Sequence, residues 1–271
     1  MRLQGKVIVV TGSTRGIGRA IAEACAREGA RVVISSRREQ AVAETSAWFQ
    51  AQGLQATGLT VDVSTPDAAE RLLEHALASW GQVDVWVNNA GLSSGYRPLD
   101  EIPGGELAEI IATNLTGTMY ACRVIIPYFR ERGGILLNMA GKGYKGDASP
   151  FTAPYAATKA AVTSLTRSLA QENKGYPISI HAVVPGMVAT DFYRDIKTSP
   201  KVAAQVASIP YVLSAFGVPL DAVSRTFVDL AAQRPGESTG RIYSLLGGRR
   251  LLRGIVLAMW YRATGKMQSS A

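Results

Sequence analysis

Seven short runs of β-branched and apolar residues alternate with helix-length segments along the chain. These runs are residues 7–11, 31–35, 56–61, 83–87, 135–138, 178–184 and 241–245. Runs such as 7–10 are apolar without interruption, which is typical of parallel strands covered on both faces. We therefore predict an α/β fold built on a doubly wound, seven-stranded parallel sheet.

No linker or internal repeat interrupts this alternation, so we expect a single domain over residues 1–248. Residues 190–220 carry three prolines and no clear strand, and we interpret them as an irregular insertion that serves as a substrate lid. Residues 249–271 follow the last predicted strand as a basic and apolar C-terminal extension.

The positive charge of the chain is concentrated near its end. The net charge is +8, but no acid follows Glu237, and six cations do: Arg241, Arg249, Arg250, Arg253, Arg262 and Lys266. A nearly neutral body predicts no nucleic-acid partner. The longest apolar stretch, 255–261, is far shorter than the roughly 20 residues that span a bilayer.

Two cysteines are too few for a disulfide framework, and the first residues lack the pattern of a signal peptide. We expect a cytoplasmic protein. His75 and His181 have no partners at metal-ligand spacing, so we interpret them as structural residues and expect no metal site.

A glycine-rich turn follows the first strand and precedes a helical pattern. Glycines in this position let the backbone approach a pyrophosphate, which then binds the amides of the helix N-terminus. A glycine triplet alone is weak, but this strand and helix context indicates a Rossmann-like dinucleotide site. The predicted cofactor-binding residues here are Gly12, Ser13, Thr14, Arg15, Gly16, Ile17 and Gly18.

The end of the second strand favours NADP(H) over NAD(H). Where an NAD enzyme places a carboxylate for the ribose, this chain has Ser36 and Arg37, and Arg15 lies in the glycine turn. A hydroxyl and guanidinium groups suit a 2′-phosphate. The alternative is that these arginines are simply solvated at the start of a helix.

Further motifs occur in a specific order: Asp62-Val63, Asn88-Asn89-Ala90-Gly91, Asn114, Tyr155-x-x-x-Lys159 and Pro185-Gly186-x-Val188-x-Thr190. Over about residues 5–247 the chain resembles the short-chain dehydrogenase/reductase family. The resemblance implies that Asp62 and Val63 flank the adenine, and that Thr190 holds the nicotinamide carboxamide. It also implies assembly as a homodimer or homotetramer. Asn114 would hold a water molecule that connects Lys159 to solvent. The cofactor site would further include Asn89, Ala90, Gly91, Pro185, Gly186 and Val188.

Tyr155 and Lys159 are the predicted catalytic pair, with Asn114 in support. They lie four residues apart at the start of a helical pattern, so both side chains share one face. A free tyrosine has a pKa of about 10, but a nearby ammonium and the nicotinamide charge both favour the phenolate. Tyr155 can then exchange a proton with a substrate oxygen at neutral pH.

The family pattern breaks at the serine that normally holds the substrate carbonyl. Ala140, Gly141 or Lys142 occupies that place, depending on the register. Either another donor substitutes, or the enzyme is slow or inactive. Alternative donors are Lys142, Tyr144, Ser149, Thr152, Ser93, Ser94 and the amides of the glycines at 141 and 143; the candidate substrate residues are Gly141, Lys142, Tyr144, Ser93, Met187 and Phe192.

The C-terminal extension has an apolar stripe at helical spacing, flanked by arginines and interrupted by Gly254. One interpretation is packing on its own fold or on a neighbouring subunit. The other is peripheral contact with an anionic membrane surface.

We predict an NADPH-dependent oxidoreductase that reduces a ketone, or oxidises the alcohol, on an apolar small molecule. An isomerase, dehydratase or cyclase using the same site remains open, as does a catalytically weak NADPH-binding scaffold or sensor.

Overall fold

The computed structural model describes residues 1–190 and 196–263. Its centre is one seven-stranded parallel sheet with strand order β3-β2-β1-β4-β5-β6-β7. The strands are β1 (Val7–Val10), β2 (Arg31–Ser36), β3 (Ala56–Thr60), β4 (Val85–Asn88), β5 (Gly134–Met139), β6 (Ile178–Val184) and β7 (Ile242–Ser244). The predicted doubly wound, Rossmann-like single-domain fold is therefore confirmed.

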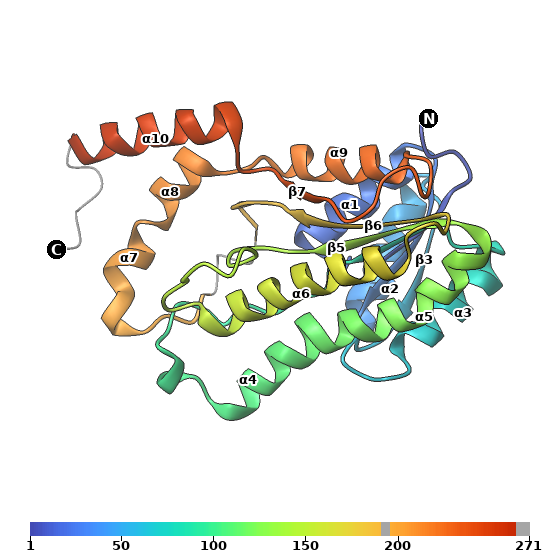
Figure 1. Cartoon of the computed structure of the whole chain (residues 1–271), viewed down its shortest axis with the longest axis horizontal. Helices are drawn as coiled ribbons and strands as arrows, with labels where there is room; N and C mark the ends of the chain where they lie inside the picture. The colour runs from blue at the N-terminus through green and yellow to red at the C-terminus, as the bar shows by residue number, and fades with distance from the viewer. Residues whose placement is uncertain (191–195, 264–271) are drawn as a thin grey trace.

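Helices cover both faces of the sheet (Figure 1). On one face lie α1 (Gly16–Arg27), α2 (Glu39–Ala51) and α9 (Leu220–Ala231). On the other lie α3 (Ala68–Trp80), α5 (Gly117–Arg132) and α6 (Ala153–Glu172). The remaining elements are η1 (Leu99–Glu101), α4 (Gly104–Ile111), η2 (Ala112–Thr116), η4 (Pro200–Val202), α7 (Ala203–Ala207), α8 (Ile209–Phe216) and α10 (Gly248–Ala263).

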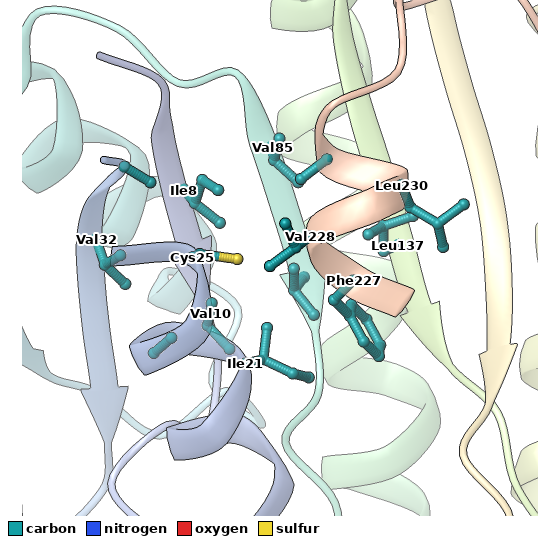
Figure 2. Packing of buried hydrophobic residues seen from close by; sticks show 14 of the residues in the cluster. Ile8, Val10, Ile21, Cys25, Val32, Val85, Leu137, Phe227, Val228 and Leu230 are labelled. Atoms are coloured by element: carbon teal, nitrogen blue, oxygen red, sulfur yellow. The ribbon is translucent and has the colours of Figure 1, made fainter. Parts of the chain in front are cut away.

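The continuous apolar runs are explained by these two layers. In β1, Ile8 and Val10 pack toward α1 and α9, whereas Val7 and Val9 pack toward α3 and α5. Figure 2 shows the first layer, where residues of the central strands meet Ile21 and Cys25 of α1 and three side chains of α9. A strand with two buried faces needs no polar position, so the period of two is absent from the sequence.

The predicted strand limits differ slightly from those observed. β4 begins at Val85 rather than at residue 83, because its parallel register with β1 starts where Ile8 pairs with Val85. β7 is shorter than predicted and spans Ile242–Ser244.

The prediction of an irregular insertion at 190–220 is wrong for its second half, which is mostly helical. The prolines begin helices instead of breaking them: Pro200 lies in the first turn of η4, Pro210 in the first turn of α8, and Pro219 directly before α9. Proline suits these positions because the first amides of a helix have no partner within it.

The C-terminal extension forms α10, which packs against α8 at one end of the molecule (Figure 1). The helix therefore packs on its own fold through one side, but the predicted packing of the apolar stripe is not observed, because Leu252, Ile255, Val256, Met259 and Trp260 are exposed. Among the residues that the structure describes, no helix is long and apolar enough to cross a membrane.

Candidate functional site

A cleft of about 400 Å³ opens at the carboxyl ends of the central strands. The strand order reverses between β1 and β4, because β2 and β3 lie on one side of β1 and the later strands on the other. In open parallel sheets this switch point is where ligands bind. The cleft is lined by loops that follow β1 to β6 and by the start of α6.

Most of the predicted cofactor residues line this cleft: Gly12, Thr14, Arg15, Gly16, Ile17, Gly18, Ser36, Arg37, Asp62, Val63, Asn89, Ala90, Gly91, Tyr155, Lys159, Pro185, Gly186, Val188 and Thr190. Ser13 does not. It is fully buried beneath the turn, where its hydroxyl donates to Val10 O at 2.6 Å and accepts from Ser35 N at 3.0 Å.

Two glycines of the turn are required by close contacts. A Cβ on Gly12 would lie 2.9 Å from Ala90 Cα, and the φ of Gly12 is +64°. A Cβ on Gly18 would lie 2.4 Å from Asn89 Nδ2, which donates to the carbonyl oxygens of Thr11 and Gly12. These contacts hold the turn against the loop after β4, so the backbone at the start of α1 borders the cleft.

The N-terminus of α1 is suited to an anion. Arg15, the residue before the helix, makes no side-chain capping hydrogen bond, and no acid occurs in the first turn. Gly16, Ile17 and Gly18 line the cleft at this helix end. The first amides of a helix carry a partial positive charge, and a phosphate is the group that such a site binds.

Cations border the far end of the cleft. Arg15, Arg37 and Arg38 line it together with Ser36 and Asp62. Burial alone would raise the pKa of Asp62, but hydrogen bonds from Ser64 and the positive charge of Arg37 lower it below its ordinary value. Arg37 therefore lies close enough to Asp62 to act on it electrostatically, at the end of the cleft where β2 and β3 terminate.

The predicted catalytic pair lies on the first turns of α6. Lys159 is buried, and its Nζ donates to Met139 O at 2.8 Å and lies 5.5 Å from the centre of the Tyr155 ring. Burial lowers the pKa of Lys159 from 10.5 to about 8. The helix and the end of β5 thus hold an ammonium group beside the phenol ring.

Asn114 joins this pair to the loop after β4. It lies in the π-helical turn η2, where its side chain accepts from Leu92 N at 2.7 Å and donates to Leu92 O at 3.0 Å. A Cβ on Gly91 would approach both Asn114 Oδ1, at 3.3 Å, and Lys159 Nζ, at 3.7 Å. The backbone of Gly91 therefore lies close to both the Asn114 side chain and the Lys159 ammonium.

Gly141 lies directly against Tyr155. A Cβ added to Gly141 would lie 2.6 Å from Tyr155 Oη and 3.4 Å from Lys159 Cγ. The neighbouring Ala140 lines the cleft, and Ala140 N donates to Val183 O at the edge of the sheet. The backbone after β5 consequently occupies the space beside the phenol.

The other candidate substrate residues are dispersed around the cleft and do not line it. Lys142 Nζ lies 5.5 Å from the centre of the Tyr96 ring, and Tyr144 packs on a small cluster that includes Ala140. The backbone of Met187 pairs with the segment after α8, since Val218 N donates to Met187 O at 2.7 Å. Phe192 lies outside the described residues.

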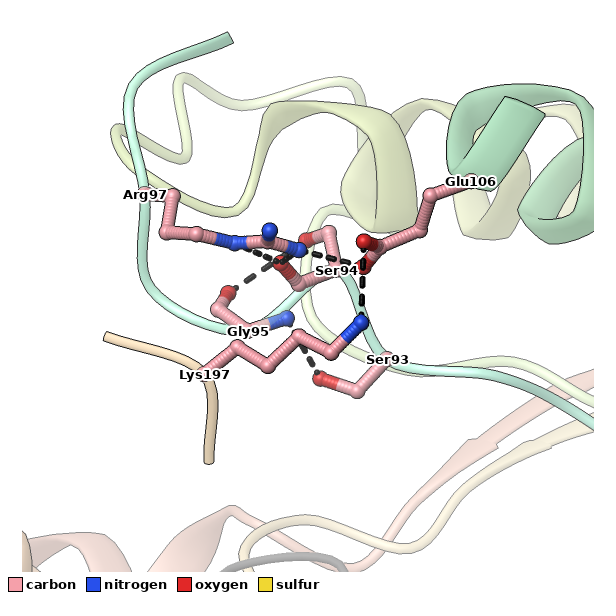
Figure 3. A network of polar contacts seen from close by, with 6 residues as sticks. All are labelled: Ser93, Ser94, Gly95, Arg97, Glu106 and Lys197. Carbon is pink, nitrogen blue, oxygen red and sulfur yellow. Dashed lines mark hydrogen bonds and ion pairs between the residues drawn. The ribbon is translucent and has the colours of Figure 1, made fainter. Parts of the chain in front are cut away.

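Ser93 belongs to a polar network at the rim (Figure 3). Its hydroxyl accepts from Gly95 N at 3.0 Å, and Arg97 donates to Ser94 O. Glu106, at the start of α4, pairs with both Arg97 and Lys197. This network ties the loop after β4 to Lys197, which lies among the first residues described after position 195.

Backbone pairing strengthens the same connection. Tyr96 N donates to Lys197 O at 2.9 Å, and Ser199 N donates to Tyr96 O at 3.0 Å. Gly95, with a φ of +68°, passes so close to Lys197 that a Cβ would lie 2.2 Å from its carbonyl oxygen. Residues 197–199 are thus fixed to the loop after β4.

Sequence reasoning missed seven further residues that line the cleft. Ser35 and Arg38 flank the predicted pair at the end of β2. The others are Val61 after β3, Leu92 after β4, Thr113 in η2, Met139 at the end of β5, and Ala140 after β5, which had been considered only for the serine position. The rule that ligands bind at the carboxyl ends of parallel strands would have identified the residues after the strands.

The histidines have structural surroundings. His75 Nε2 lies 3.0 Å from Thr57 Oγ1, and His181 is buried in β6, where burial lowers its pKa to about 4. Over residues 1–190 and 196–263 no group of three or more His, Cys, Asp or Glu side chains could hold a metal ion.

Comparison with known proteins agrees with this geometry. Residues 6–201 match the family model described as short chain dehydrogenase. A 3β-hydroxysteroid dehydrogenase of Eggerthella lenta is 34% identical over 256 residues, covering 93% of this chain and 96% of the relative. A 3-oxoacyl-acyl-carrier-protein reductase of Haemophilus influenzae is 32% identical over 250 residues, covering 91% and 98%.

A probable chloroplastic chlorophyll(ide) b reductase of Oryza sativa is 33% identical over 203 residues, which are 68% of this chain and 40% of that relative. The alignment thus spans about two fifths of the plant protein. The family match covers the glycine turn and helix α6 with Tyr155 and Lys159, and it ends at residue 201. The chain belongs to the short-chain dehydrogenase/reductase family.

Proposed function

We propose that this protein is an NADP(H)-dependent oxidoreductase that reduces a ketone, or oxidises the corresponding alcohol, on an apolar small molecule. The observation that carries the proposal is the arrangement of a single cleft. Tyr155 lies beside the buried Lys159 ammonium where the start of α6 lines the cleft. Where the glycine turn and the end of β2 line it, the N-terminus of α1 and Arg37 offer sites for phosphate groups.

Tyr155 is the proton donor in the reducing direction. When bound, the reduced nicotinamide supplies a hydride to the carbonyl carbon. Tyr155 Oη gives its proton to the carbonyl oxygen, and in the oxidising direction the phenolate takes the alcohol proton. The Lys159 ammonium favours that phenolate through its positive charge. Asn114 fixes the loop after β4 next to Lys159 and, as a further part of the proposal, holds the water that returns protons from solvent.

The preference for NADP(H) follows from the charges at the ends of β2 and β3. Ser36 offers a hydroxyl there, and Arg15 and Arg37 offer guanidinium groups that match a 2′-phosphate. Asp62 follows the neighbouring strand β3, and the positive charge of Arg37 is one of the influences that lower its pKa. We expect Arg37→Ala to weaken NADPH binding by about tenfold or more while leaving NADH binding nearly unchanged.

The reaction proceeds without the family's serine hydroxyl in this proposal. Ala140, Gly141 or Lys142 stands in the place of that serine, and the contact between Gly141 and Tyr155 Oη favours Gly141. Lys142, Tyr144, Ser93 and Met187 remain the proposed substrate residues. A substrate that is oriented mainly by apolar contacts with the lid places less demand on a second hydrogen-bond donor.

An apolar substrate fits both the lid and the relatives. Helix α8 of the lid is rich in apolar side chains, with the sequence Ile-Pro-Tyr-Val-Leu-Ser-Ala-Phe. The relatives named above act on a 3β-hydroxysteroid, a 3-oxoacyl group and chlorophyll(ide) b. Each of these presents an oxygen function on a largely hydrocarbon body. Assembly as a homodimer or homotetramer is also part of the proposal, and light scattering measures it.

The deciding experiment is a panel of apolar ketones, aldehydes and alcohols, supplied with NADPH and NADH in parallel. We expect turnover of at least one ketone with NADPH, with one cofactor oxidised for each alcohol formed. Product formation without net cofactor oxidation would point to a non-redox isomerase, dehydratase or cyclase. Tight NADPH binding without turnover of any compound would point to a scaffold or sensor, and either result would overturn the proposal.

A further inference from the structure

Helix α10 presents five large apolar side chains to solvent. The exposed fractions are 66% for Leu252, 42% for Ile255, 61% for Val256, 58% for Met259 and 49% for Trp260. Their spacing of three, four, seven and eight residues places them along a single face of the helix. We call these five residues the outer face of α10.

The opposite side of the helix is anchored to the fold. Gly254 is buried, and a Cβ there would lie 2.2 Å from Phe216 Cδ1 of α8. The hydroxyls of Tyr261 and Ser214 are hydrogen-bonded at 3.0 Å, and the rings of Tyr211 and Tyr261 meet edge to face at 5.6 Å. Because this side is occupied by α8, the outer face is directed away from the molecule, where α10 lies along its outside (Figure 1).

The charge of the C-terminal segment indicates whether a second copy of the chain or an anionic surface covers the outer face. Helix α10 contains Arg249, Arg250, Arg253 and Arg262, and no acid occurs anywhere after Glu237. A second copy packed on this face would bring another set of the same cations against the first, without acids on either helix to offset them. An anionic surface instead gains from every arginine.

The arginine positions also agree with a surface-bound helix. At about 100° per residue, positions 253 and 262 fall on the two borders of the outer face, position 249 falls within its arc, and position 250 falls toward the other side. Basic residues that border an apolar face are typical of helices that lie in the plane of a bilayer interface. Trp260, near the end of the outer face, has the amphipathic ring that such interfaces favour.

We propose that α10 docks this enzyme on an anionic lipid bilayer as a peripheral, in-plane helix. The outer face enters the boundary between headgroups and acyl chains, and the arginines contact lipid phosphates. The helix has 16 residues, fewer than the roughly 20 needed to span the hydrocarbon core. The inference rests on the outer face and its charge, and it is independent of the proposed substrate and cofactor.

Vesicle co-sedimentation of the full-length protein tests this proposal. The vesicles are phosphatidylcholine alone, or phosphatidylcholine containing a quarter of phosphatidylglycerol. We expect binding to the anionic vesicles that decreases as NaCl is raised from about 0.1 M to about 0.5 M, because salt screens the arginine–phosphate attraction. Binding to the neutral vesicles should be at least about fivefold weaker, since each basic residue near an anionic surface contributes about 1 kcal/mol.

The double variant Val256→Glu, Met259→Glu places two carboxylates on the outer face. Both positions are exposed, so folding should be preserved, and the thermal unfolding midpoint checks this. We expect binding to anionic vesicles to fall by at least about tenfold, because two apolar anchors are lost. The matched control is Leu99→Glu, which changes an apolar residue with 56% exposure outside α10 and should bind vesicles like the parent.

Two results would overturn the proposal. The first is equal binding of the parent and the double variant to anionic vesicles, or no binding by either. The second is a parent oligomer, seen by size-exclusion chromatography with light scattering, that dissociates in the double variant while Leu99→Glu leaves it intact. That second result would assign the outer face to contact between copies of the chain.

Discussion

Lysine 159 should make the stability of the protein depend on pH in an unusual direction. In the folded chain its pKa is about 8, against 10.5 for an ordinary lysine, because burial disfavours the charged form. At pH values between these two numbers the unfolded chain binds more protons than the folded chain. Stability therefore rises with pH across that window, and below it the full cost of the buried charge is present.

The size of this effect follows from the two pKa values. Each pKa unit corresponds to about 1.4 kcal/mol, so the buried ammonium costs roughly 3 kcal/mol of folding free energy at pH 7. At pH 10 most of this cost is gone, and roughly 1 kcal/mol remains. The methionine variant Lys159→Met has no charge at this position and lacks the dependence.

The assay is urea unfolding of the cofactor-free parent and Lys159→Met at equal protein concentration across this pH range. Between pH 7 and pH 10 the parent should gain roughly 2 to 3 kcal/mol relative to the variant. The variant also loses the hydrogen bond to Met139 O, which lowers its unfolding free energy at both pH 7 and pH 10. This loss therefore largely cancels when the pH dependence is compared. A difference that stays constant across the range would refute the assignment of a buried ammonium.

Three further predictions concern the tyrosine, the lid and the C-terminal helix. Gly141→Ala should displace the phenol of Tyr155 and lower kcat by about 100-fold in steady-state assays, with little change in the Kd for NADPH. Glu106→Gln should destabilise the protein by roughly 2 kcal/mol at neutral pH in urea unfolding, because Arg97 and Lys197 lose the carboxylate to which they donate. Gly254→Val should force α10 away from Phe216 and expose the C-terminal segment to limited proteolysis.

These predictions have internal controls. Hydrogen bonds from Arg97, and then from Lys197, lower the pKa of Glu106, so its contribution is present above the ordinary carboxyl pKa and is lost as the pH falls through the lowered value. The difference between parent and Glu106→Gln should shrink accordingly in acid. Gly247→Val is the control for the helix variant, since a Cβ there meets no atom within 4 Å.

Contradicting outcomes are equally specific. A Gly141→Ala enzyme with the parent's kcat would mean that Tyr155 does not depend on this contact. A Glu106→Gln protein with the parent's stability at neutral pH would show that the ion pairs of Glu106 with Arg97 and Lys197 do not stabilise the fold. Equal proteolysis of the Gly254 and Gly247 variants would show that the approach to α8 is not tight.

The sheet could be predicted because its strands are buried on both faces. Residues 7–10 are apolar throughout because alternate side chains enter different layers, which leaves a strong pattern in the sequence. The predicted cofactor residues came from the glycine turn and the ordered motifs, and they line one cleft because the carboxyl ends of parallel strands meet at one edge of the sheet.

The helices between residues 200 and 216 and the glycine contacts could not be predicted, because they depend on close approaches in space. Pro200 and Pro210 resembled loop residues, although each lies in the first turn of a helix. Gly254 was interpreted as a weak point of a helix, whereas it allows α10 to approach Phe216. The contact of Gly141 with Tyr155 depends on the backbone path of a loop that no periodic pattern describes.

The central claim is that the phenol of Tyr155 exchanges the substrate proton in a cleft that binds NADPH independently of that phenol. The most direct test is Tyr155→Phe, measured for both turnover and NADPH affinity with the ketone found in the panel. We predict a loss of about 100-fold to 10,000-fold in kcat/KM, with the Kd for NADPH changed by less than about twofold. Turnover by the variant at the parent rate would contradict the account.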